Sequence, residues 1–322
     1  MKAAVLHKLG KAPRYEDFPD PIAGDGETLI RVKAVALENI DRALARGSHF
    51  ATKQFLPHLP AIVGLDGIGA LDDGRLIGFG GMKPPYGAMA EKAVIPSQQY
   101  APIPDGVDAA VAAAVPGSAL TALFPLRCGV QLQQGETVLV NGATGFTGKL
   151  AVQVARLLGA GRVVATGRND ESLRRLPGLG ADSVIDLKQS DASVISAFKR
   201  EAASGYDVIL DFLWGRPTEL LIAAMVPDKL TFAQRRIRLV QIGEMAGERI
   251  NLPADSLRTS GLSISGAGAN LTPEAVAEGT SQVWDWIKEG KLEADIERAP
   301  LKDVERAWKR NDAHGRRIVI IP

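Results

Sequence analysis

The stretch TVLVNGATGFTGKLAVQVARLL, residues 137–158, decides the fold. Thr137–Val140 is a short run of apolar and β-branched residues, which is typical of a buried parallel strand. Gly142, Gly145 and Gly148 follow the strand, and leucines and valines then recur at helical spacing. Glycines between a strand and a helix predict a turn whose backbone N–H groups, with the helix dipole, bind the phosphates of a dinucleotide. The alternative is a strand–turn–helix that only needs small residues.

Each of the three glycines has its own expected role in such a turn. Gly142 permits the tight turn itself, because glycine tolerates backbone conformations that other residues avoid. Gly145 lets the backbone approach a pyrophosphate with no Cβ in the way. Gly148 lets the helix pack close to the strand.

Composition limits the kind of protein that the sequence encodes. The chain has 322 residues, enough for one or two domains, with 46% hydrophobic and 23% charged residues, as in an ordinary soluble globular protein. A net charge of +1 gives no reason to expect nucleic acid or an anionic membrane as a partner. The single cysteine, Cys128, excludes an intrachain disulfide.

No segment of the sequence predicts a secretory signal or a membrane helix. The apolar run in MKAAVLHKLG is too short for a signal peptide. Ala109–Val115 is apolar, but we expect Pro116 and Gly117 to end it well before the roughly 18 residues that a membrane helix needs. We therefore expect a cytoplasmic protein with no membrane partner.

Residues 1–107 are typical of a β-rich domain. Lys2–Leu6 and Glu27–Ala36 predict strands, and the second alternates as a half-exposed strand does. Ile40–Arg46 predicts a short helix that ends at Gly47. Short strands separated by glycine turns indicate a barrel-like domain.

From residue 108 the pattern changes to helices that alternate with strands. After the glycine turn the expected strands are Arg162–Thr166, Ser183–Leu187, Asp207–Asp211, Arg238–Ile242 and Leu262–Ser265. Such alternation indicates a doubly wound parallel sheet with helices on both faces. We interpret the basic connection Leu230–Arg236 as a solvated surface helix. The predicted domains are 1–107, 108–268 and 269–322, the last returning to the first domain.

The residues after the second strand of this sheet indicate which dinucleotide binds. An acidic residue there would accept hydrogen bonds from the ribose of NAD. Instead the strand ends in Thr166, Gly167, Arg168 and Asn169, with no carboxylate before Asp170. A guanidinium suits a 2′-phosphate because it stays charged and bonds in bidentate fashion, so we predict NADP(H). The alternative is that Arg168 is an ordinary solvated loop residue.

The sequence lacks a recognisable metal-ligand set. The histidines are His7, His49, His58 and His314, with no helical pairing and no cysteine nearby in the sequence. A structural zinc needs about four thiolate or imidazole ligands and a catalytic zinc about three, so we expect no metal. His49 is interpreted as a pocket or surface residue, with a proton-donor role as the alternative.

The whole chain resembles the medium-chain dehydrogenase/reductase superfamily, and within it the zinc-free quinone oxidoreductase-like branch. The segments that carry the resemblance are MKAAVL at the start, LENIDRALARGSHF with Asn39 and Asp41, LPAIVGLDGIG, LTALFPL, GETVLVNGATG and the closing GRRIVII. The resemblance implies a Rossmann domain plus a β-rich, barrel-like (GroES-like) catalytic domain, with the cofactor in the cleft between them. It also implies a homodimer.

The chain departs from the superfamily pattern at several places. Glu38 and its neighbours stand where zinc-dependent relatives carry a cysteine ligand, and Leu65 and Asp66 stand where they carry a histidine followed by Glu. The four-cysteine zinc lobe is missing. Phe146 and Thr147 replace the usual small residue and valine of the glycine loop.

The resemblance also implies which residues form the site. Those at the pyrophosphate are Gly142, Ala143, Thr144, Gly145, Phe146, Thr147 and Gly148. Those at the rest of the cofactor are Gly167, Arg168, Asn169, Asp211, Phe212, Ile242, Gly243, Thr121, Arg316 and Arg317. The substrate wall would include Asn39, Asp41, His49 and Tyr86.

The activity that the resemblance implies is transfer of hydride from NADPH to a small electrophile, a quinone or an α,β-unsaturated carbonyl, without a metal. No acid or base stands out in the sequence, which suits a reaction in which binding and orientation carry much of the rate. Two alternatives remain: an enoyl-thioester reductase, and a cofactor-binding protein with a sensing role and little turnover.

Overall fold

The computed structural model of the chain describes residues 1–227, 235–268, 270–310 and 315–322. These residues form two compact units, the first of 1–116 with 295–322 and the second of 117–294. The predicted division differs in two places, because it assigns residues 108–116 to the second domain and residues 269–294 to the first. Helix α9 (Pro273–Lys288) belongs to the second unit because its Val283 and Trp286 are buried in that unit's hydrophobic core. Most of the predicted helix at Leu230–Arg236 lies outside the described residues.

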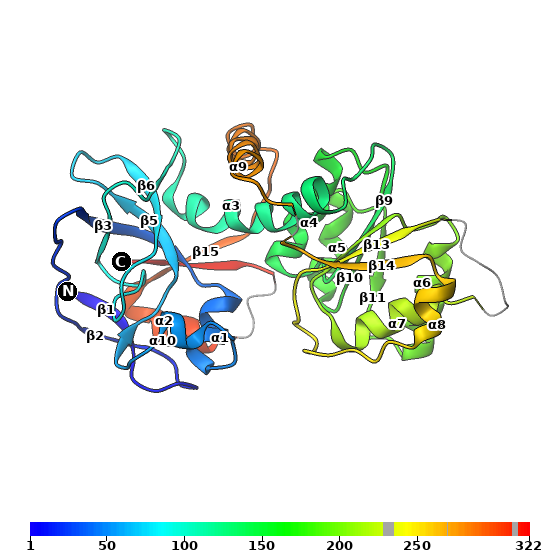
Figure 1. Cartoon of the computed structure of the whole chain (residues 1–322), viewed down its shortest axis with the longest axis horizontal. Helices are drawn as coiled ribbons and strands as arrows, with labels where there is room; N and C mark the ends of the chain where they lie inside the picture. The colour runs from blue at the N-terminus through cyan, green and yellow to red at the C-terminus, as the bar shows by residue number, and fades with distance from the viewer. Residues whose placement is uncertain (228–234, 269, 311–314) are drawn as a thin grey trace. The chain divides into compact units, whose positions relative to one another are not determined.

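The second unit is built on a parallel sheet of six strands (Figure 1). The strands are β9 (Thr137–Asn141), β10 (Arg162–Gly167), β11 (Ser183–Asp186), β12 (Val208–Asp211), β13 (Ile237–Gln241) and β14 (Leu262–Gly266). They lie in the order β11-β10-β9-β12-β13-β14, and every neighbouring pair is parallel. The order reverses between β9 and β12, which is the switch point where doubly wound sheets bind ligands. The predicted doubly wound sheet is therefore confirmed.

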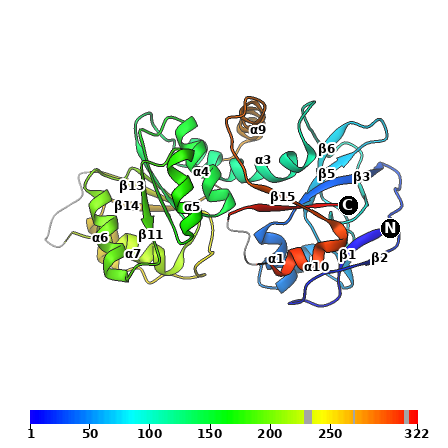
Figure 2. The same cartoon turned by 180° about the vertical axis from the view of Figure 1, so that it is seen from behind.

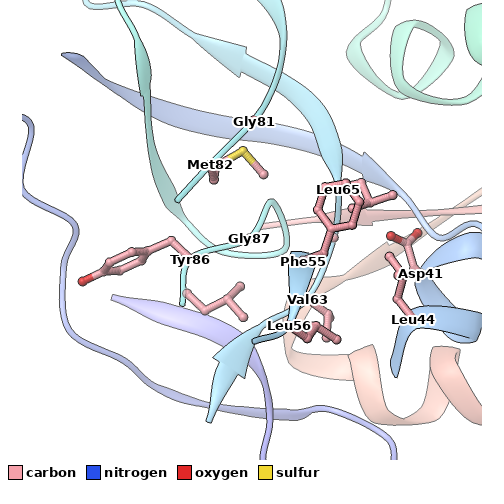
Figure 3. A pocket seen from close by; sticks show the side chains of 12 residues that line it. Asp41, Leu44, Phe55, Leu56, Val63, Leu65, Gly81, Met82, Tyr86 and Gly87 are labelled. Carbon is pink, nitrogen blue, oxygen red and sulfur yellow. The ribbon is translucent and has the colours of Figure 1, made fainter. Parts of the chain in front are cut away.

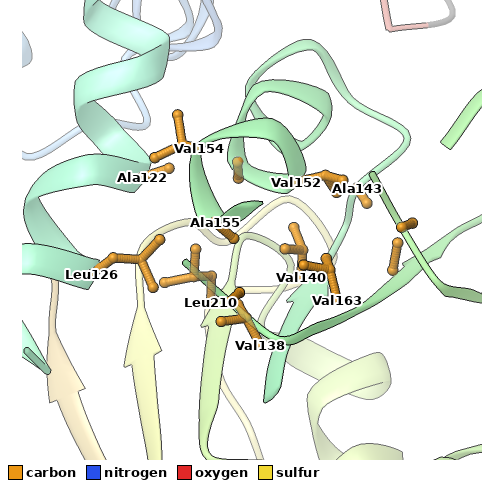
Figure 4. Packing of buried hydrophobic residues seen from close by; sticks show 14 of the residues in the cluster. Ala122, Leu126, Val138, Val140, Ala143, Val152, Val154, Ala155, Val163 and Leu210 are labelled. Carbon is orange, nitrogen blue, oxygen red and sulfur yellow. The ribbon is translucent and has the colours of Figure 1, made fainter. Parts of the chain in front are cut away.

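Helices cover both faces of this sheet (Figures 1 and 2). They include α4 (Phe146–Leu157), α5 (Asp170–Arg175), α6 (Asp191–Ala202), α7 (Gly215–Met225) and α8 (Ala254–Thr259), with a 3₁₀ turn at Leu176–Leu179. On one face, valines and alanines of β9 and α4 pack with Ala122 and Leu126 (Figure 4). On the other face, Phe198 of α6 and Leu221 of α7 pack against Leu139 and Ile209. Strand residues buried on both sides explain the continuous apolar runs in the sequence.

The prediction that Pro116 and Gly117 end the apolar helix was wrong. Helix α3 (Ala109–Phe124) continues through both residues and leads into a π-helical turn at Pro125–Gly129. Residues 109–129 are therefore long and apolar enough, by length and composition, to cross a membrane. Ala119, Leu123 and Leu126 are fully buried inside the protein, so packing in a core accounts for this apolar character. The burial of residues beyond the proline also explains why a helix-breaking residue does not end the helix.

The described residues of the first unit form two sheets and four short helical segments, and the unit also contains the first part of α3, up to Pro116. Its strands are β1 (Lys2–Leu6), β2 (Arg14–Asp17), β3 (Glu27–Ala36), β4 (Ala61–Ile62), β5 (Asp66–Ala70), β6 (Leu76–Gly80), β7 (Lys92–Pro96), β8 (Ala101–Pro102), β15 (Ile296–Pro300) and β16 (Arg317–Ile321). Its helices are α1 (Asn39–Arg46), α2 (Thr52–Phe55), α10 (Val304–Lys309) and the 3₁₀ turn Leu301–Asp303.

The longer sheet of the first unit pairs β3, from the first part of the sequence, with the C-terminal strand. Its order is β15-β16-β3-β5-β6-β8, with β7 also paired to β3, and the other sheet is β2-β1-β4. The C-terminal strand β16 pairs antiparallel with β3, through Val319 opposite Ala36. This pairing brings Arg317, at the start of β16, to the residues that follow β3, where α1 begins.

Candidate functional site

The glycine turn of the second unit has the backbone that its sequence predicts. Gly142 has φ of 99°, in the region that favours glycine. A Cβ at Gly148 would lie 2.3 Å from the Gly142 carbonyl oxygen, so no larger residue fits unless the turn moves. A Cβ at Gly145 would meet nothing closer than 3.8 Å, and Gly145 is exposed. The turn is therefore closely packed around Gly148 and open to solvent at Gly145.

Helix α4 starts directly after this turn. Its N-cap is Gly145, which has no side chain to satisfy the N–H groups of the first turn. Such N–H groups, at the positive end of a helix dipole, bind anions. Phe146 is only 8% exposed, so its ring packs inside the protein. Thr147 donates a hydrogen bond of 3.4 Å to Ser118 of α3, and Thr121 lies one helical turn beyond Ser118.

The end of β10 lies beside the glycine turn. Thr166 Oγ1 accepts a hydrogen bond of 3.0 Å from the Gly142 N–H. A Cβ at Gly167 would lie 2.1 Å from Thr144 Cγ2, so a side chain there would displace Thr144. The structure therefore brings the start of the glycine turn and the end of β10 together, as the sequence predicts for a dinucleotide site.

Arg168 and Asn169 follow β10 and differ in what their side chains do. Asn169 Oδ1 accepts a hydrogen bond of 2.8 Å from the Ser172 N–H and so caps α5. The Arg168 side chain is exposed, and within the described part of the chain it takes part in no ion pair. A solvated guanidinium therefore stands two residues beyond the Thr166 hydroxyl that contacts the turn.

A buried polar network supports the switch point. Asp211, at the end of β12, is fully buried, and its Oδ1 accepts hydrogen bonds from Asn141 Nδ2 at 2.9 Å and from the Leu213 N–H at 3.0 Å. Its Oδ2 accepts one of 2.6 Å from Thr218 Oγ1. Both carboxylate oxygens are thus engaged inside the protein, which assigns Asp211 to holding the loop after β12. Sequence analysis missed Asn141 and Thr218 as its partners.

The remaining sequence-predicted cofactor residues divide between the two units. Phe212, Ile242 and Gly243 lie at the same edge of the sheet, where the Ile242 N–H donates to the Asp211 carbonyl at 2.8 Å. Arg316 and Arg317 belong to β16 and its approach, in the first unit. Arg317 Nη2 lies 3.4 Å from Glu38 Oε1, and Arg317 Nη1 donates to the Leu37 carbonyl at 3.3 Å.

The first unit contains a pocket next to the N-terminus of α1 (Figure 3). Its cavity volume is about 40 Å³. The lining residues are mostly apolar: Leu44, Phe55, Leu56, Ile62, Val63, Leu65 and Met82, with Gly64, Gly81, Gly87, Asp41 and Tyr86. Asp41 is the carboxylic acid of this lining and is only 4% exposed.

The pocket contains two of the four residues predicted for the substrate wall. Asp41 and Tyr86 line it, but the Tyr86 hydroxyl points away from Asp41 (Figure 3), and its ring packs edge-on against Phe18 at 5.7 Å. Asn39 is exposed at the start of α1 and is outside the lining. His49 stacks on Phe50 and accepts a hydrogen bond of 3.2 Å from the Ala51 N–H, also outside the lining.

Burial changes the acidity of Asp41. The pKa of the Asp41 carboxyl is raised to about 7, mainly by burial and also by the charges of Glu38 and Asp66, while backbone hydrogen bonds from Glu38 and Leu65 oppose the rise. Although Asp66 reaches solvent, nearby protein atoms remove part of its hydration. That desolvation and the Glu38 charge raise its pKa to about 6, against the effect of Arg317.

The cluster of Glu38, Asp66 and Arg317 was not predicted as a unit. The sequence signal for it was an acidic residue near each of two places where zinc-dependent relatives have ligands, Glu38 at the cysteine position and Asp66 directly after the histidine position. Across the described ranges of the chain, no group of three or more His, Cys, Asp or Glu side chains is placed to hold a metal ion. His314 lies outside the described residues.

Comparison with known proteins adds independent information. Residues 147–289 match the zinc-binding dehydrogenase family model. The chain is 27% identical to the probable NADPH-dependent quinone reductase tdiC of Emericella nidulans, covering 96% of each chain. It is 26% identical to the trans-enoyl reductase pgmF of Aspergillus terreus, covering 85% of this chain and 79% of that protein.

A solved structure covers the whole chain. The quinone oxidoreductase of Thermus thermophilus, determined alone and in complex with NADPH, is 30% identical, with a TM-score of 0.79 and complete coverage of both chains. The similarity therefore extends over both compact units.

Proposed function

The chain belongs to the quinone oxidoreductase-like branch of the medium-chain dehydrogenase/reductase superfamily, and we propose that it is an NADPH-dependent oxidoreductase that reduces a quinone or an α,β-unsaturated carbonyl without a metal. Two similar proteins support this proposal: one is named a probable NADPH-dependent quinone reductase, and the other is a quinone oxidoreductase solved in complex with NADPH. The single observation that carries it in the structure is the glycine turn at the switch point of the parallel sheet. The backbone of this turn is closely packed around Gly148, whereas Gly145 has open space beside it.

The residues of the second unit fit the proposed cofactor. The backbone from Gly142 to Gly148, with the N-terminus of α4, would hold the pyrophosphate. Arg168 would pair with the 2′-phosphate, because its guanidinium is exposed and follows the strand end next to that turn. When bound, the cofactor supplies the hydride. The fully buried Asp211 would keep the loop after β12 in place through its hydrogen bonds to Leu213 and Trp214.

We propose that the electrophile binds at the pocket of the first unit. Its apolar lining, from Leu44, Phe55, Val63 and Met82 among others, would bury a flat unsaturated ring or chain. One carboxylic acid, Asp41, would orient a carbonyl oxygen. Binding and orientation of this kind supply much of the rate in reactions whose chemistry belongs to the cofactor.

A second candidate activity is reduction of an enoyl thioester. The similarity to a trans-enoyl reductase favours it. Both candidate reactions use the same hydride donor and differ in the compound that accepts the hydride. Activity measured on a panel of acceptors therefore distinguishes the two activities. A protein that binds NADPH tightly but turns over no acceptor would instead match the sensing alternative.

The experiment that tests the proposal follows NADPH oxidation by the purified protein with 1,4-benzoquinone, 2-cyclohexenone and crotonyl-CoA. We expect turnover with the quinone or the enone, and the same rate after dialysis against a chelator, because the described residues supply no zinc-ligand set. Exclusive activity on crotonyl-CoA would favour the second candidate. Stoichiometric zinc whose removal abolishes turnover would contradict the metal-free mechanism.

We also propose that the protein works as a homodimer in the cytoplasm, on the basis of the family. Sedimentation velocity at micromolar concentration checks the assembly, and a monomer there would contradict it. Fractionation of cells that express the protein checks its location.

A further inference from the structure

Asp41 is a carboxylic acid enclosed by an apolar pocket. It lies in α1, which begins directly after Glu38, and it lines the cavity beside Leu44 and Leu65 (Figure 3). With 4% of its surface exposed, its ionised form has lost most of its hydration. A charged carboxylate in such a place needs strong compensation, whereas a neutral carboxylic acid does not.

The hydrogen bonds of Asp41 are compatible with a neutral acid. Its Oδ2 accepts a hydrogen bond of 2.8 Å from the Glu38 N–H, which closes the capping box of α1. A backbone hydrogen bond from Leu65 adds to this. A protonated carboxyl keeps acceptor capacity for backbone N–H groups and gains one O–H donor. That O–H group can donate a hydrogen bond to a carbonyl oxygen in the pocket.

The charged groups that act on Asp41 and its acidic neighbours come from α1 and the residue before it, from β5 and from β16. Glu38 precedes α1 and Asp66 lies on β5, and both oppose ionisation of Asp41. Arg42 on the same helix is the cation that interacts with it. Arg317 of β16 lies 3.4 Å from Glu38 and also acts on Asp66, so its charge is shared with these acids. The positive N-terminus of α1 favours the ionised form, and burial outweighs it.

We propose that Asp41 is the general acid of the reaction and donates its proton to the carbonyl oxygen of the bound quinone or enone. This inference rests on the proposed function. Hydride addition forms a C–H bond at the electrophilic carbon, and the electron pair of the π system moves to the carbonyl oxygen. The Asp41 O–H bond breaks and its proton joins that oxygen. The hydride and its electron pair would come from a C–H bond of bound NADPH, with NADP⁺ as the oxidised product. Asp41 remains as a carboxylate.

The pocket also offers a route for restoring the proton. Its cavity volume of about 40 Å³ is large enough for a water molecule, since a cavity that holds one buried water needs a volume of roughly 10–15 Å³. A water in the cavity would return a proton from solvent to Asp41 after each turnover. Asp66, which reaches solvent and carries a raised pKa, lies next to Leu65 in the sequence and is suited to supply it.

The first test needs no cofactor. Carbon NMR of protein labelled at aspartate Cγ should show one resonance that titrates near pH 7 and is missing from the Asp41→Asn variant. The exposed Asp72→Asn makes the same change of charge in the same unit and is the matched control, because it should leave that resonance in place. An Asp41 resonance that titrates near pH 4 would overturn the proposal.

The second test follows single-turnover oxidation of NADPH with 2-cyclohexenone from pH 5 to 9. Because the protonated acid is the active form, the wild-type rate should fall as pH rises through about 7. Asp41→Asn should be slower at pH 6 by about 10²-fold or more and should show no such fall. Glu38→Gln, which removes a charge that opposes ionisation, should move the wild-type profile to lower pH.

The outcomes separate this inference from the proposed function. An active wild type whose rate and pH profile persist in Asp41→Asn would overturn the inference alone. If Asp41→Asn does not fold, an unshifted profile in Glu38→Gln would overturn it instead. A wild type that oxidises NADPH with none of the acceptors would overturn the proposed function and, with it, the catalytic role of Asp41.

Discussion

Asn141 and Asp211 join the two strands between which the order of the parallel sheet reverses, through a hydrogen bond of 2.9 Å from Asn141 Nδ2 to Asp211 Oδ1. Asn141 Oδ1 in turn accepts a hydrogen bond of 2.8 Å from Thr166 Oγ1, whose oxygen accepts from the Gly142 N–H. The ends of β9, β10 and β12 are thus connected by side chains that are completely buried. Buried networks of this kind are costly when they lose one member.

Asn141→Ala should therefore destabilise the second unit and loosen the glycine turn. The substitution leaves the Thr166 hydroxyl without its acceptor and removes one of the donors to Asp211 Oδ1. A buried polar group that loses its partner costs about 1–3 kcal/mol. We expect a lower free energy of unfolding in urea and weaker NADPH binding. Asn251→Ala, at an exposed position, is the control and should change neither. Unchanged stability in Asn141→Ala would show that water replaces the network.

The two glycines of the turn should respond differently to alanine. Gly148→Ala places a Cβ 2.3 Å from a backbone oxygen, so the turn must move, at a cost of about 1–3 kcal/mol in stability. Gly145→Ala meets only an atom at 3.8 Å, so folding should be nearly unaffected. Its methyl group would instead point into the open side where the pyrophosphate is proposed to bind. We expect Gly145→Ala to keep its thermal midpoint but lose NADPH affinity.

Stability and NADPH affinity should both be measured on Gly148→Ala and on Gly145→Ala. Calorimetry gives stability and fluorescence titration gives the dissociation constant of NADPH. Equal stability losses in the two variants would contradict the packing described here. Wild-type NADPH affinity in Gly145→Ala would show that the cofactor does not approach the turn at that residue.

The buried carboxyl of Asp41 should leave a mark on stability as a function of pH. Its pKa rises from 3.8, the ordinary value, to about 7 in the folded protein. Between these values the folded state binds more protons than the unfolded state, so this group lowers stability as pH rises from about 4 to 7. Below pH 4 the contribution vanishes. A shift of about three pK units corresponds to about 4 kcal/mol.

Asp41→Asn removes that contribution, because an amide does not ionise. Relative to the wild type, the variant should gain stability as pH rises from 5 to 8, measured by urea unfolding at each pH. The difference between the two proteins isolates Asp41 from the other carboxylates. A difference that does not vary with pH would show that Asp41 titrates at its ordinary value in the folded state.

Local patterns in the sequence predicted much of the second unit and less of the first. The strand, the glycine turn and the helix at residues 137–158 were predictable because the positive φ of Gly142 and the contact of Gly148 with Gly142 and Ala143 are local features. The helix through Pro116 was not, because burial of residues beyond the proline decides it. Likewise, Glu38 and Arg317 lie at opposite ends of the sequence, and only the pairing of β16 with β3 brings them together.

The sequence also did not predict which individual polar side chains are buried. The family resemblance implied that Asp211 lies at the cofactor, and in the structure its two oxygens accept hydrogen bonds from Asn141, Thr218 and the loop after β12. Asp41 was predicted only as part of a substrate wall. Its enclosure among residues of α1, α2 and the segment before β5 depends on tertiary packing, which no local pattern encodes.

Arg168 should decide the choice between the two nicotinamide cofactors. It follows β10, whose end contacts the glycine turn through Thr166, so the adenosine ribose should lie near it if the turn holds the pyrophosphate. A 2′-phosphate there would gain a charge-assisted hydrogen bond of about 1.5–3 kcal/mol. That corresponds to roughly a tenfold to hundredfold preference for NADPH over NADH.

Arg168→Ala should therefore weaken NADPH much more than NADH, because NADH has no 2′-phosphate to lose a partner. The reaction of bound substrate should be largely unchanged, since the adenosine end takes no part in hydride transfer. Arg174→Ala, which removes an exposed arginine from the same region in α5, is the matched control for loss of charge and should alter both affinities little. The measurement is the dissociation constant of each cofactor for the wild type and both variants. If the wild type binds NADH as tightly as NADPH, or if Arg168→Ala weakens both equally, Arg168 is an ordinary solvated residue and the cofactor preference has another origin.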